Sequence, residues 1–519
     1  MTRGLALGLL CVAAAAGAAP FEVRTVPHPY PAAGDFFGAS VALRGGRLVV
    51  GAPRRDQPGA ADAGAVYVFD AGSGALLHAL VAPAPIADAR LGSAVAAVGA
   101  DVVAGAPHED SGAPHAGAVH VFALAGGTHL RTVPNPEPAL DDGFGGAVAG
   151  AGGDLVIGAR LDGAGIADGG AAYVVGAGTA PRLTLLAPTP AAYALVGASV
   201  ATDGSVAVVG APGDATVAPN GGAAHVFALA TGTWIGTLRP TPPALGDDFG
   251  RALAVGAGLI VVGAPLDEAE NVSDAGTVYV YDAATLAFRL RLTSPQPVAG
   301  GRFGTAVALR GTDIVVGAPH EGSGVVHLFT GDGVPLGSIA NPTPAPDDQF
   351  GAALASEGMV LAVGAWHDDA GANDAGAVHV IVDLGAPSVT TTTVAGVPPT
   401  SVTSTTATSV TLPTPVTTTT VVDGASTTTS TSVATSTTTP GSIPLATTTT
   451  TAVSASTTTT TPPSGEVCDP AAPDACDDAD ACTLDACSSD GRCLHAALGG
   501  LDAVSCRLDA LGAAMDREG

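Results

Sequence analysis

The stretch FGTAVALRGTDIVVGAP, Phe303 to Pro319, contains the pattern that decides the fold. It joins a Phe-Gly pair, two short apolar runs separated by a Gly turn, and a closing Gly-Ala-Pro. Short β-branched runs with a tight turn between them predict a hairpin of two strands. The chain repeats nearly the same arrangement six more times.

The Phe-Gly pair is an anchor that recurs at intervals of 54, 53, 52, 53, 54 and 47 residues. Gly-Ala-Pro or a close variant begins fourteen residues after every anchor, and two further apolar runs follow in most copies. Each copy therefore predicts a four-stranded meander, and seven copies predict a radial β-propeller. The anchors begin at Phe37, Leu91, Phe144, Val196, Phe249, Phe303 and Phe350.

The two ends of the repeat region complement each other. The seventh copy stops after its third run, Val378 to Val382, and lacks a fourth. Ahead of the first anchor, the segment Phe21 to Pro31 resembles His129 to Pro138, the run that closes the second copy. We expect the N-terminal segment to supply the missing outer strand of the last blade, which closes the ring and leaves no open sheet edge there.

Composition agrees with an all-β protein and bounds its partners. The 519 residues include 71 Gly and 40 Pro but only 4% aromatic residues, which favours many short elements joined by turns. The formal net charge is -28 and all 19 basic residues are Arg. A polyanion would be repelled by this charge, so we exclude nucleic acid as a partner.

Four regions follow one another along the chain. Residues 1–19 are predicted to be a signal peptide, because Arg3 precedes an apolar run that is too short to span a bilayer. Residues 20–386 form the predicted propeller, which we expect to be monomeric, and residues 387–464 form a Thr-rich linker expected to be disordered. Residues 465–519 form a Cys-rich module. The protein is therefore expected to be secreted, extracellular or at the cell surface, without a transmembrane segment.

The motifs FGxxVA, LVVGAP and GAVYVF, in this order, resemble the FG-GAP repeats of the integrin α-chain propeller and its bacterial relatives. The resemblance implies a seven-bladed propeller closed by its N-terminal strand, with a role in adhesion or recognition. Integrin-like repeats carry calcium loops between the first two strands of several blades. Here that connection is a bare turn such as Arg44 to Arg47, so the family's calcium ligands cannot be assigned.

Acidic residues follow Gly-Ala-Pro and precede the third run, so we expect them on one rim of the propeller. Either they cap turns and keep the protein soluble, or pairs of them chelate Ca²⁺, the one cofactor considered. On the same rim, Trp366 replaces a repeat Pro and could stack on a sugar or simply pack. The cation and ligand candidates are Asp267, Glu268, Asp274, Asp368, Asp369, Asp374 and Trp366.

The histidines of the repeats fall into two groups. His120, His225, His327 and His379 occupy the third-run position that Tyr holds in other copies, so we expect them to pack between blades. His108, His320 and His367 follow Gly-Ala-Pro, or its variant, on the loop rim. They could ligate a transition metal if their blades converged.

The C-terminal tail resembles short Cys-rich modules of the type CDDGDxCTxDxC found in secreted bacterial proteins. Its six cysteines predict up to three disulfides, with the pairing left open. Asp477, Asp480 and Asp485 could bind Ca²⁺, the alternative being a plain disulfide knot. The cysteines are Cys468, Cys476, Cys482, Cys487, Cys493 and Cys506.

These features favour a non-catalytic binding or adhesion protein whose propeller loops recognise an extracellular protein or glycan. The alternative is an extracellular enzyme, for instance one that acts on polysaccharide, with its site on the acidic loop face. A purely structural envelope component is a third possibility. The sequence carries no Gly-x-Ser-x-Gly, His-Glu-x-x-His or phosphate-loop motif, so no catalytic residue is assigned.

Overall fold

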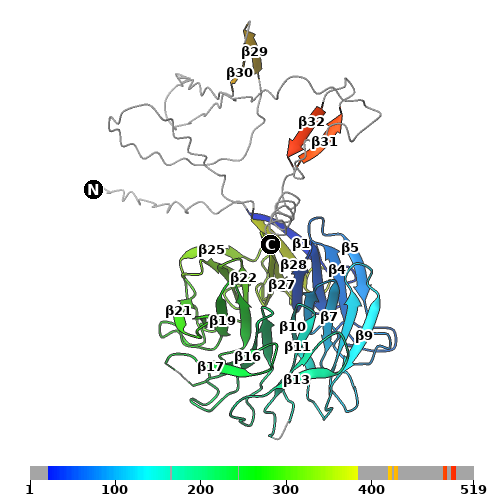
Figure 1. Cartoon of the computed structure of the whole chain (residues 1–519), viewed down its shortest axis with the longest axis vertical. Coiled ribbons are helices and arrows are strands. Elements are labelled where there is room, and N and C mark those ends of the chain that lie inside the picture. Colours follow the sequence, from blue (N-terminus) through cyan, green and yellow to red (C-terminus); the bar gives the residue numbers. More distant parts are fainter. Residues whose placement is uncertain are drawn as a thin grey trace, which may run out of the picture. The chain divides into compact units, whose positions relative to one another are not determined.

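The computed structural model describes residues 21–163, 166–242 and 245–383, together with four short strands nearer the C-terminus. Residues 21–383 form seven antiparallel four-stranded sheets, and no helix occurs among the described residues. The prediction of an all-β, seven-bladed propeller is confirmed (Figure 1). No helix of the described part is long and apolar enough to cross a membrane.

In blades 1 to 6 the strands lie in the sheet in chain order, from the innermost to the outermost, whereas the outermost strand of blade 7 is β1, the first strand of the chain. Blade 1 contains β2 (Ser40–Arg44), β3 (Arg47–Ala52), β4 (Ala65–Asp70) and β5 (Leu76–Leu80); blade 2 contains β6 (Ala94–Val98), β7 (Asp101–Ala106), β8 (Ala118–Ala123) and β9 (His129–Pro134); blade 3 contains β10 (Phe144–Ala151), β11 (Asp154–Ala159), β12 (Ala171–Val175) and β13 (Pro181–Leu185); blade 4 contains β14 (Ser199–Thr202), β15 (Val206–Ala211), β16 (Ala223–Ala228) and β17 (Trp234–Leu238). Blade 5 contains β18 (Ala252–Gly256), β19 (Leu259–Ala264), β20 (Thr277–Asp282) and β21 (Phe288–Thr293); blade 6 contains β22 (Ala306–Arg310), β23 (Asp313–Ala318), β24 (Val325–Phe329) and β25 (Pro335–Ala340); blade 7 contains β26 (Ala353–Glu357), β27 (Val360–Ala365), β28 (Ala377–Asp383) and β1 (Phe21–Pro27).

The ring is closed by the first strand of the chain. Strand β1 pairs antiparallel with β28, from Phe21 opposite Asp383 to Pro27 opposite Ala377. Thr25 lies opposite His379, and its Oγ1 is 3.0 Å from the Nδ1 of that histidine. The N-terminal segment is therefore the outer strand of blade 7, as its resemblance to the fourth run of another copy predicts (Figure 1).

The innermost strands form a ring around a central channel. Strands β2, β6, β10, β14, β18, β22 and β26 contact one another in this order, and β26 contacts β2. The strand starts of all seven blades line a cavity of about 290 Å³ on the axis. The turns from innermost to second strand lie at one end, so the longer loops, from second to third strand and from blade to blade, gather at the other (Figure 1).

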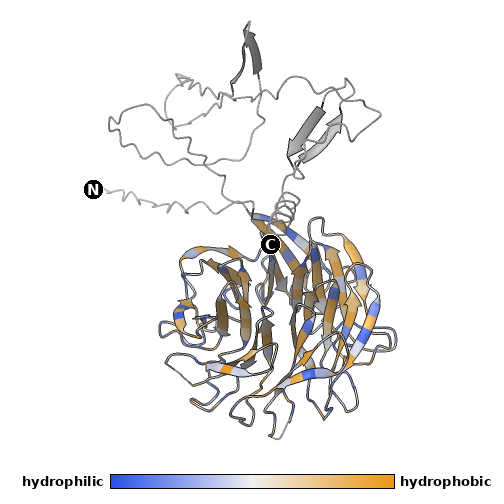
Figure 2. Cartoon of the chain, viewed as in Figure 1, coloured by the Kyte–Doolittle hydropathy of each residue, from blue (hydrophilic) through white to orange (hydrophobic). Residues whose placement is uncertain are grey.

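The anchor residues hold neighbouring blades together. Phe303 is fully buried and packs in one cluster with Val280 of blade 5 and Val316 of blade 6. The Gly of each Gly-Ala-Pro is required by the close approach of the next anchor. A Cβ on Gly317 would lie 1.9 Å from the carbonyl oxygen of Gly351 in blade 7. The motif that defines the repeat therefore forms the contact between neighbouring blades. The strands of the blades are largely hydrophobic (Figure 2), and apolar side chains of adjacent sheets pack against one another.

The second part of the chain contributes two hairpins to the described residues. Strand β29 (Thr419–Asp423) pairs with β30 (Ser426–Ser430), and β31 (Thr483–Cys487) pairs with β32 (Cys493–Ala497). Cys487 lies opposite Cys493 in that register. The predicted signal peptide, the rest of the linker and most of the Cys-rich module, including Asp477 and Asp480, lie outside the described residues, and the side chain of Asp485 is not described.

Candidate functional site

The loop end of the channel opens into a basic, partly aromatic mouth. A cavity of about 560 Å³ is lined there by residues of blades 1, 2, 5, 6 and 7, and an adjoining cavity of about 480 Å³ by residues of blades 2 and 3. Most of the residues that line these cavities occupy three equivalent positions of the repeat: the residue before the anchor, the residue after the anchor Gly, and the residues that follow Gly-Ala. Five of these residues are arginines: Arg54, Arg90, Arg160, Arg251 and Arg302.

Three of the arginines have local partners. Arg90 Nε lies 2.8 Å from Asp88 Oδ1 and forms an ion pair. The guanidinium carbon of Arg54 lies 4.7 Å from the ring centroid of Phe36, in a cation–π contact. Arg302 Nη1 is 3.4 Å from His320 Nε2. These contacts fix the side chains, but only Arg90 is neutralised by a carboxylate within hydrogen-bonding distance.

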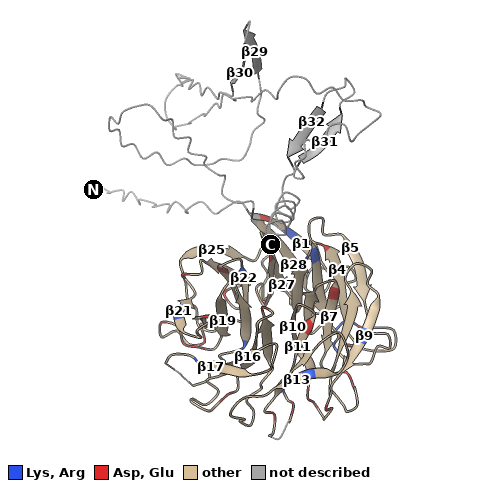
Figure 3. Cartoon of the chain, viewed as in Figure 1, with Lys and Arg blue, Asp and Glu red and all other residues tan. Residues whose placement is uncertain are grey.

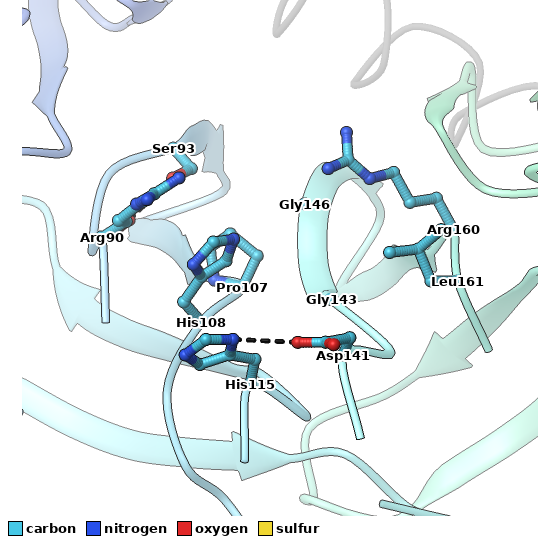
Figure 4. A pocket seen from close by; sticks show the side chains of 10 residues that line it. All are labelled: Arg90, Ser93, Pro107, His108, His115, Asp141, Gly143, Gly146, Arg160 and Leu161. Atoms are coloured by element: carbon cyan, nitrogen blue, oxygen red, sulfur yellow. Dashed lines mark hydrogen bonds and ion pairs between the residues drawn. The ribbon is translucent and has the colours of Figure 1, made fainter. Parts of the chain in front are cut away.

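Arg160 and Arg251 are exposed, and the described residues give neither of them a direct hydrogen bond or ion pair. The carboxyl of Asp248 nevertheless lies close enough to Arg251 and Arg302 for their charges to oppose the rise that burial causes in its pKa. Loss of surrounding water in the mouth, followed by the positive charges of Arg251 and Arg90, lowers the pKa of Arg160. Like charges therefore face one another across the opening, and Figure 4 shows the Arg160 side chain extending away from the His115–Asp141 pair. An anion placed between them would relieve this repulsion.

Aromatic side chains form one side of the mouth. Trp366 and Phe36 meet edge to face with centroids 4.7 Å apart, and His367 stacks on Phe36 at 5.3 Å. Trp366 is partly exposed and lines the larger cavity together with Arg54 and Arg302. Trp366, the sugar-stacking candidate, therefore lies where arginines of several blades converge.

A cluster of two histidines and two aspartates occupies the floor of the smaller cavity. His108 Nδ1 lies 3.3 Å from Asp88 Oδ2, and His115 Nε2 lies 3.8 Å from the same oxygen. On its other side, His115 Nδ1 is 2.9 Å from Asp141 Oδ1 (Figure 4). Burial lowers the pKa of His108, so its imidazole is neutral at pH 7. Burial raises the pKa of Asp88, but hydrogen bonds from His108 and Arg90 outweigh this effect. The pKa of Asp88 therefore lies below its usual value, and the carboxyl is ionised at pH 7.

Figure 3 marks the acidic residues along the chain in red, and several of those that follow Gly-Ala-Pro or its variant are buried. They are Asp162, Asp214, Asp267, Glu321 and Asp368. Asp267 is 5% exposed and accepts a hydrogen bond from the hydroxyl of Tyr279 at 2.6 Å. Asp368 is buried and accepts hydrogen bonds from the Ala370 amide at 2.8 Å and from Thr343 Oγ1 at 3.2 Å. Both carboxylates thus have structural partners.

The other cation candidates stay on the surface. Glu268 and Asp274 are exposed. Asp369 accepts a hydrogen bond from the amide of Asp374 at 2.9 Å, and Asp374 Oδ1 lies 3.3 Å from His367 Nδ1. Turn capping thus accounts for Asp369, and calcium binding by these loops stays a prediction.

The third-strand histidines pack as expected. His120, His225, His327 and His379 are at most 4% exposed. Each faces the acid two residues after Gly-Ala-Pro or its variant in the same blade; for example, His327 Nε2 lies 2.9 Å from Glu321 Oε2. Tyr279 and Asp267 form the equivalent pair in blade 5. A buried ring paired with a buried acid is thus a recurring structural element of these repeats.

The arginines of the mouth were not foreseen from the sequence. The signal was present in the alignment of the copies, because Arg160 replaces a repeat Pro and Arg251 stands where other copies have Ala, Ser, Gly or Thr. Net charge concealed it, since a chain at -28 does not suggest a basic site. The convergence becomes evident only when blades far apart in sequence are placed around one axis.

Seven four-stranded blades, a closing N-terminal strand and a loop-end mouth define a β-propeller whose candidate site lies on its axis. The FG-GAP repeat family matches residues 31–69, 183–227, 237–281 and 341–381, which cover the first three strands of blades 1, 4, 5 and 7. Together with the seven blades, these matches identify the domain as an FG-GAP repeat propeller. No curated protein matches the chain significantly.

Proposed function

We propose that the protein is a secreted or surface-displayed, non-catalytic binding protein that holds an acidic glycan at the mouth of its propeller. The N-terminal segment that resembles a signal peptide supports export. The propeller supplies a rigid frame, and the mouth supplies cationic and aromatic groups from several blades. Together these groups suit a ligand with carboxylate or sulfate groups on sugar rings.

The exposed pair Arg160 and Arg251 is the observation that carries the proposal. In a chain of net charge -28, carboxylates are abundant, yet neither guanidinium forms a direct ion pair with one among the described residues, and Asp248 interacts with Arg251 only through its charge. Guanidinium groups bind carboxylate and sulfate-like oxyanions through parallel hydrogen bonds, and they are weakly hydrated compared with ammonium groups. The arrangement therefore favours an anionic ligand.

The aromatic side of the mouth favours a glycan as the carrier of that charge. Ligand sites combine apolar walls with a few polar groups that fix orientation. Trp366 offers such a wall beside Arg54 and Arg302, and it is the large aromatic that replaces a repeat Pro. A sugar face on Trp366 would place acidic substituents toward the arginines.

The lining also favours binding over glycoside hydrolysis. That chemistry needs two carboxyl groups about 5 to 10 Å apart across the scissile bond. Two carboxyl groups lie at the smaller cavity: Asp141 is bonded to His115, and Asp88 is bonded to Arg90 and His108. Because basic side chains engage both carboxyl groups, this pair is poorly suited to act as the acid and base of glycoside hydrolysis.

The proposal is tested by calorimetric titration of the full-length protein with a heparin-derived hexasaccharide, and with a neutral hexasaccharide for comparison. A mouth variant combines R160Q, R251T and R302Q, in which Thr and Gln are the residues found at the last two positions in other blades. The control variant, R44Q with R289Q and R291Q, removes the same charge from exposed arginines elsewhere.

We expect the wild type to bind the sulfated sugar and the mouth variant to bind it at least about tenfold more weakly, since one lost charge-assisted hydrogen bond costs about 1.5–3 kcal/mol. The control variant should change affinity less than about twofold, because distant surface charges are screened. Equal weakening in both variants would indicate nonspecific charge attraction and would contradict the proposal. Cleavage of the sugar would favour the enzymatic alternative.

A further inference from the structure

Three side chains of blade 2 place metal-ligating atoms close together. The oxygen Asp88 Oδ2 and the nitrogens of His108 and His115 all lie within 4.8 Å of one another. The oxygen is 3.3 Å from His108 Nδ1 and 3.8 Å from His115 Nε2. Ligands of a tetrahedral ion with bonds of about 2.0–2.1 Å are about 3.3 Å apart, so small side-chain rotations suffice.

We propose that Asp88, His108 and His115 form a binding site for a divalent transition-metal ion of the Zn²⁺ type. Two imidazoles and one carboxylate are donors that such ions prefer, and they leave a coordination position open. The three side chains are partly exposed, with Asp88 and His115 near 40%, so an ion can reach them from the cavity. The site does not depend on glycan binding by the mouth.

The surrounding contacts orient the donors. Asp141 Oδ1 lies 2.9 Å from His115 Nδ1, so the tautomer that donates a hydrogen bond from Nδ1 to Asp141 would present Nε2 to an ion beside Asp88. On the other side, Arg90 Nε donates to Asp88 Oδ1 at 2.8 Å, so Oδ2, which faces His108 Nδ1 at 3.3 Å, is the oxygen that an ion would share with the histidine. Such outer partners are typical of metal-ligating histidines and carboxylates.

The backbone holds the donors in place before any ion arrives. The amide of Asp88 donates to the carbonyl oxygen of Ala61 at 2.8 Å, and the amide of His108 donates to that of Ala89 at 3.3 Å. The amide of His115 donates to Asp110 Oδ1 at 3.0 Å. The three residues are therefore anchored to the repeat framework and not to a free loop.

Comparison with the other blades shows that the fold does not require these histidines. At the position of His115 the backbone is left-handed, with φ of 52°, and the equivalent residues are Asp62, Asp168, Asn220, Asp274 and Asp374. Asp and Asn tolerate this conformation best, so His115 is a departure from the repeat. At the position of His108, blades 3 and 5 have Leu161 and Leu266. Blade 2 alone has histidine at both positions.

Blades 6 and 7 provide internal controls. His320 occupies the position of His108 in blade 6, but Gly300 stands there in place of Asp88. In blade 7, His367 lies 3.3 Å from Asp374 and 3.7 Å from Asp347, which gives one nitrogen donor and two carboxylates. The same repeat geometry therefore presents three different donor sets, and blade 2 is the one richest in nitrogen.

The proposal is tested by titrating full-length protein, with its cysteines blocked, with ZnCl₂ at pH 7.5 by calorimetry and with CoCl₂ by visible absorption. The variants are H108L and H115N, which introduce residues found at the same positions in other blades. The control is H320L, the same substitution at the equivalent position of blade 6. Wild type and H320L should bind one ion through this site with equal affinity.

We expect H108L and H115N to bind Zn²⁺ at least about tenfold more weakly, because even outer partners of metal ligands contribute ten- to hundredfold to affinity. D141N should also weaken binding, by about tenfold or more, without removing a ligand. Absence of Zn²⁺ binding in the wild type would overturn the proposal. Binding that is unchanged in H108L and H115N would also overturn it. Neither result bears on the heparin titration.

Discussion

Replacement of His379 by Tyr should make the protein less sensitive to acid. His379 is fully buried at the closure of the ring, and burial lowers its pKa from 6.5 to about 4. The native state therefore holds the imidazole neutral, with Nδ1 3.0 Å from Thr25 Oγ1, whereas the unfolded chain takes up a proton below about pH 6.5. His379 therefore has little effect on the free energy of folding above about pH 6.5, and it destabilises the native state increasingly as the pH falls toward 4.

The size of the effect follows from linkage. One unit of pKa corresponds to about 1.36 kcal/mol, so linkage gives a cost of about 3 kcal/mol of folding free energy from His379 at pH 4 and about 2 kcal/mol at pH 5. Tyr occupies the equivalent position in blades 1, 3 and 5 and does not titrate in this range. Relative to wild type, H379Y should therefore gain about 2 kcal/mol on going from pH 7 to pH 5.

The assay is guanidinium chloride unfolding of both proteins at the two pH values, with the difference in unfolding free energy as the readout. The pKa of His225 is likewise lowered to about 4 by burial, so H225Y should give a similar shift. A difference between H379Y and wild type that stays the same at pH 7 and pH 5 would refute the reasoning. It would mean that the native state accommodates a protonated His379.

Three further changes test buried contacts within blades and between neighbouring blades. Y279F removes the hydroxyl that donates to buried Asp267 at 2.6 Å and should lower the free energy of unfolding by about 1.5–3 kcal/mol in urea titrations; no loss would contradict the pairing. G317A places a Cβ 1.9 Å from the carbonyl oxygen of Gly351 and should cost at least about 1–3 kcal/mol in thermal unfolding, whereas G256A, with its nearest contact at 3.6 Å, should cost less than about 1 kcal/mol. Deletion of residues 21–27 exposes the edge of β28 and should cause concentration-dependent association in sedimentation experiments; a stable monomer would argue against closure by β1.

The fold could be predicted almost completely because the physical constraint is repeated. An anchor such as Phe303 and a Gly such as Gly317 recur at a fixed spacing, and a spacing that holds seven times identifies the unit and the number of blades. The closing strand was predictable for the same reason, since Phe21 to Pro31 resembles the fourth run of another copy.

The site was much less predictable, because it depends on which residues meet across the axis. Asp267 reads as an exposed ligand in sequence, yet Tyr279 opposite it makes it a buried acceptor. Arg160 and Arg251 belong to blades 3 and 5, and only the ring brings their charges to one opening. His108 and His115 are seven residues apart in the chain, but their common partner Asp88 lies on the connection from the preceding blade.

The most direct test of the acidic-glycan site is a determined structure of the protein with the heparin-derived hexasaccharide bound. It should show sulfate or carboxylate oxygens about 2.7–2.9 Å from the guanidinium nitrogens of Arg160 and Arg251, with a sugar ring against Trp366. A hexasaccharide bound to another face of the propeller, with both guanidinium groups still free, would contradict the account.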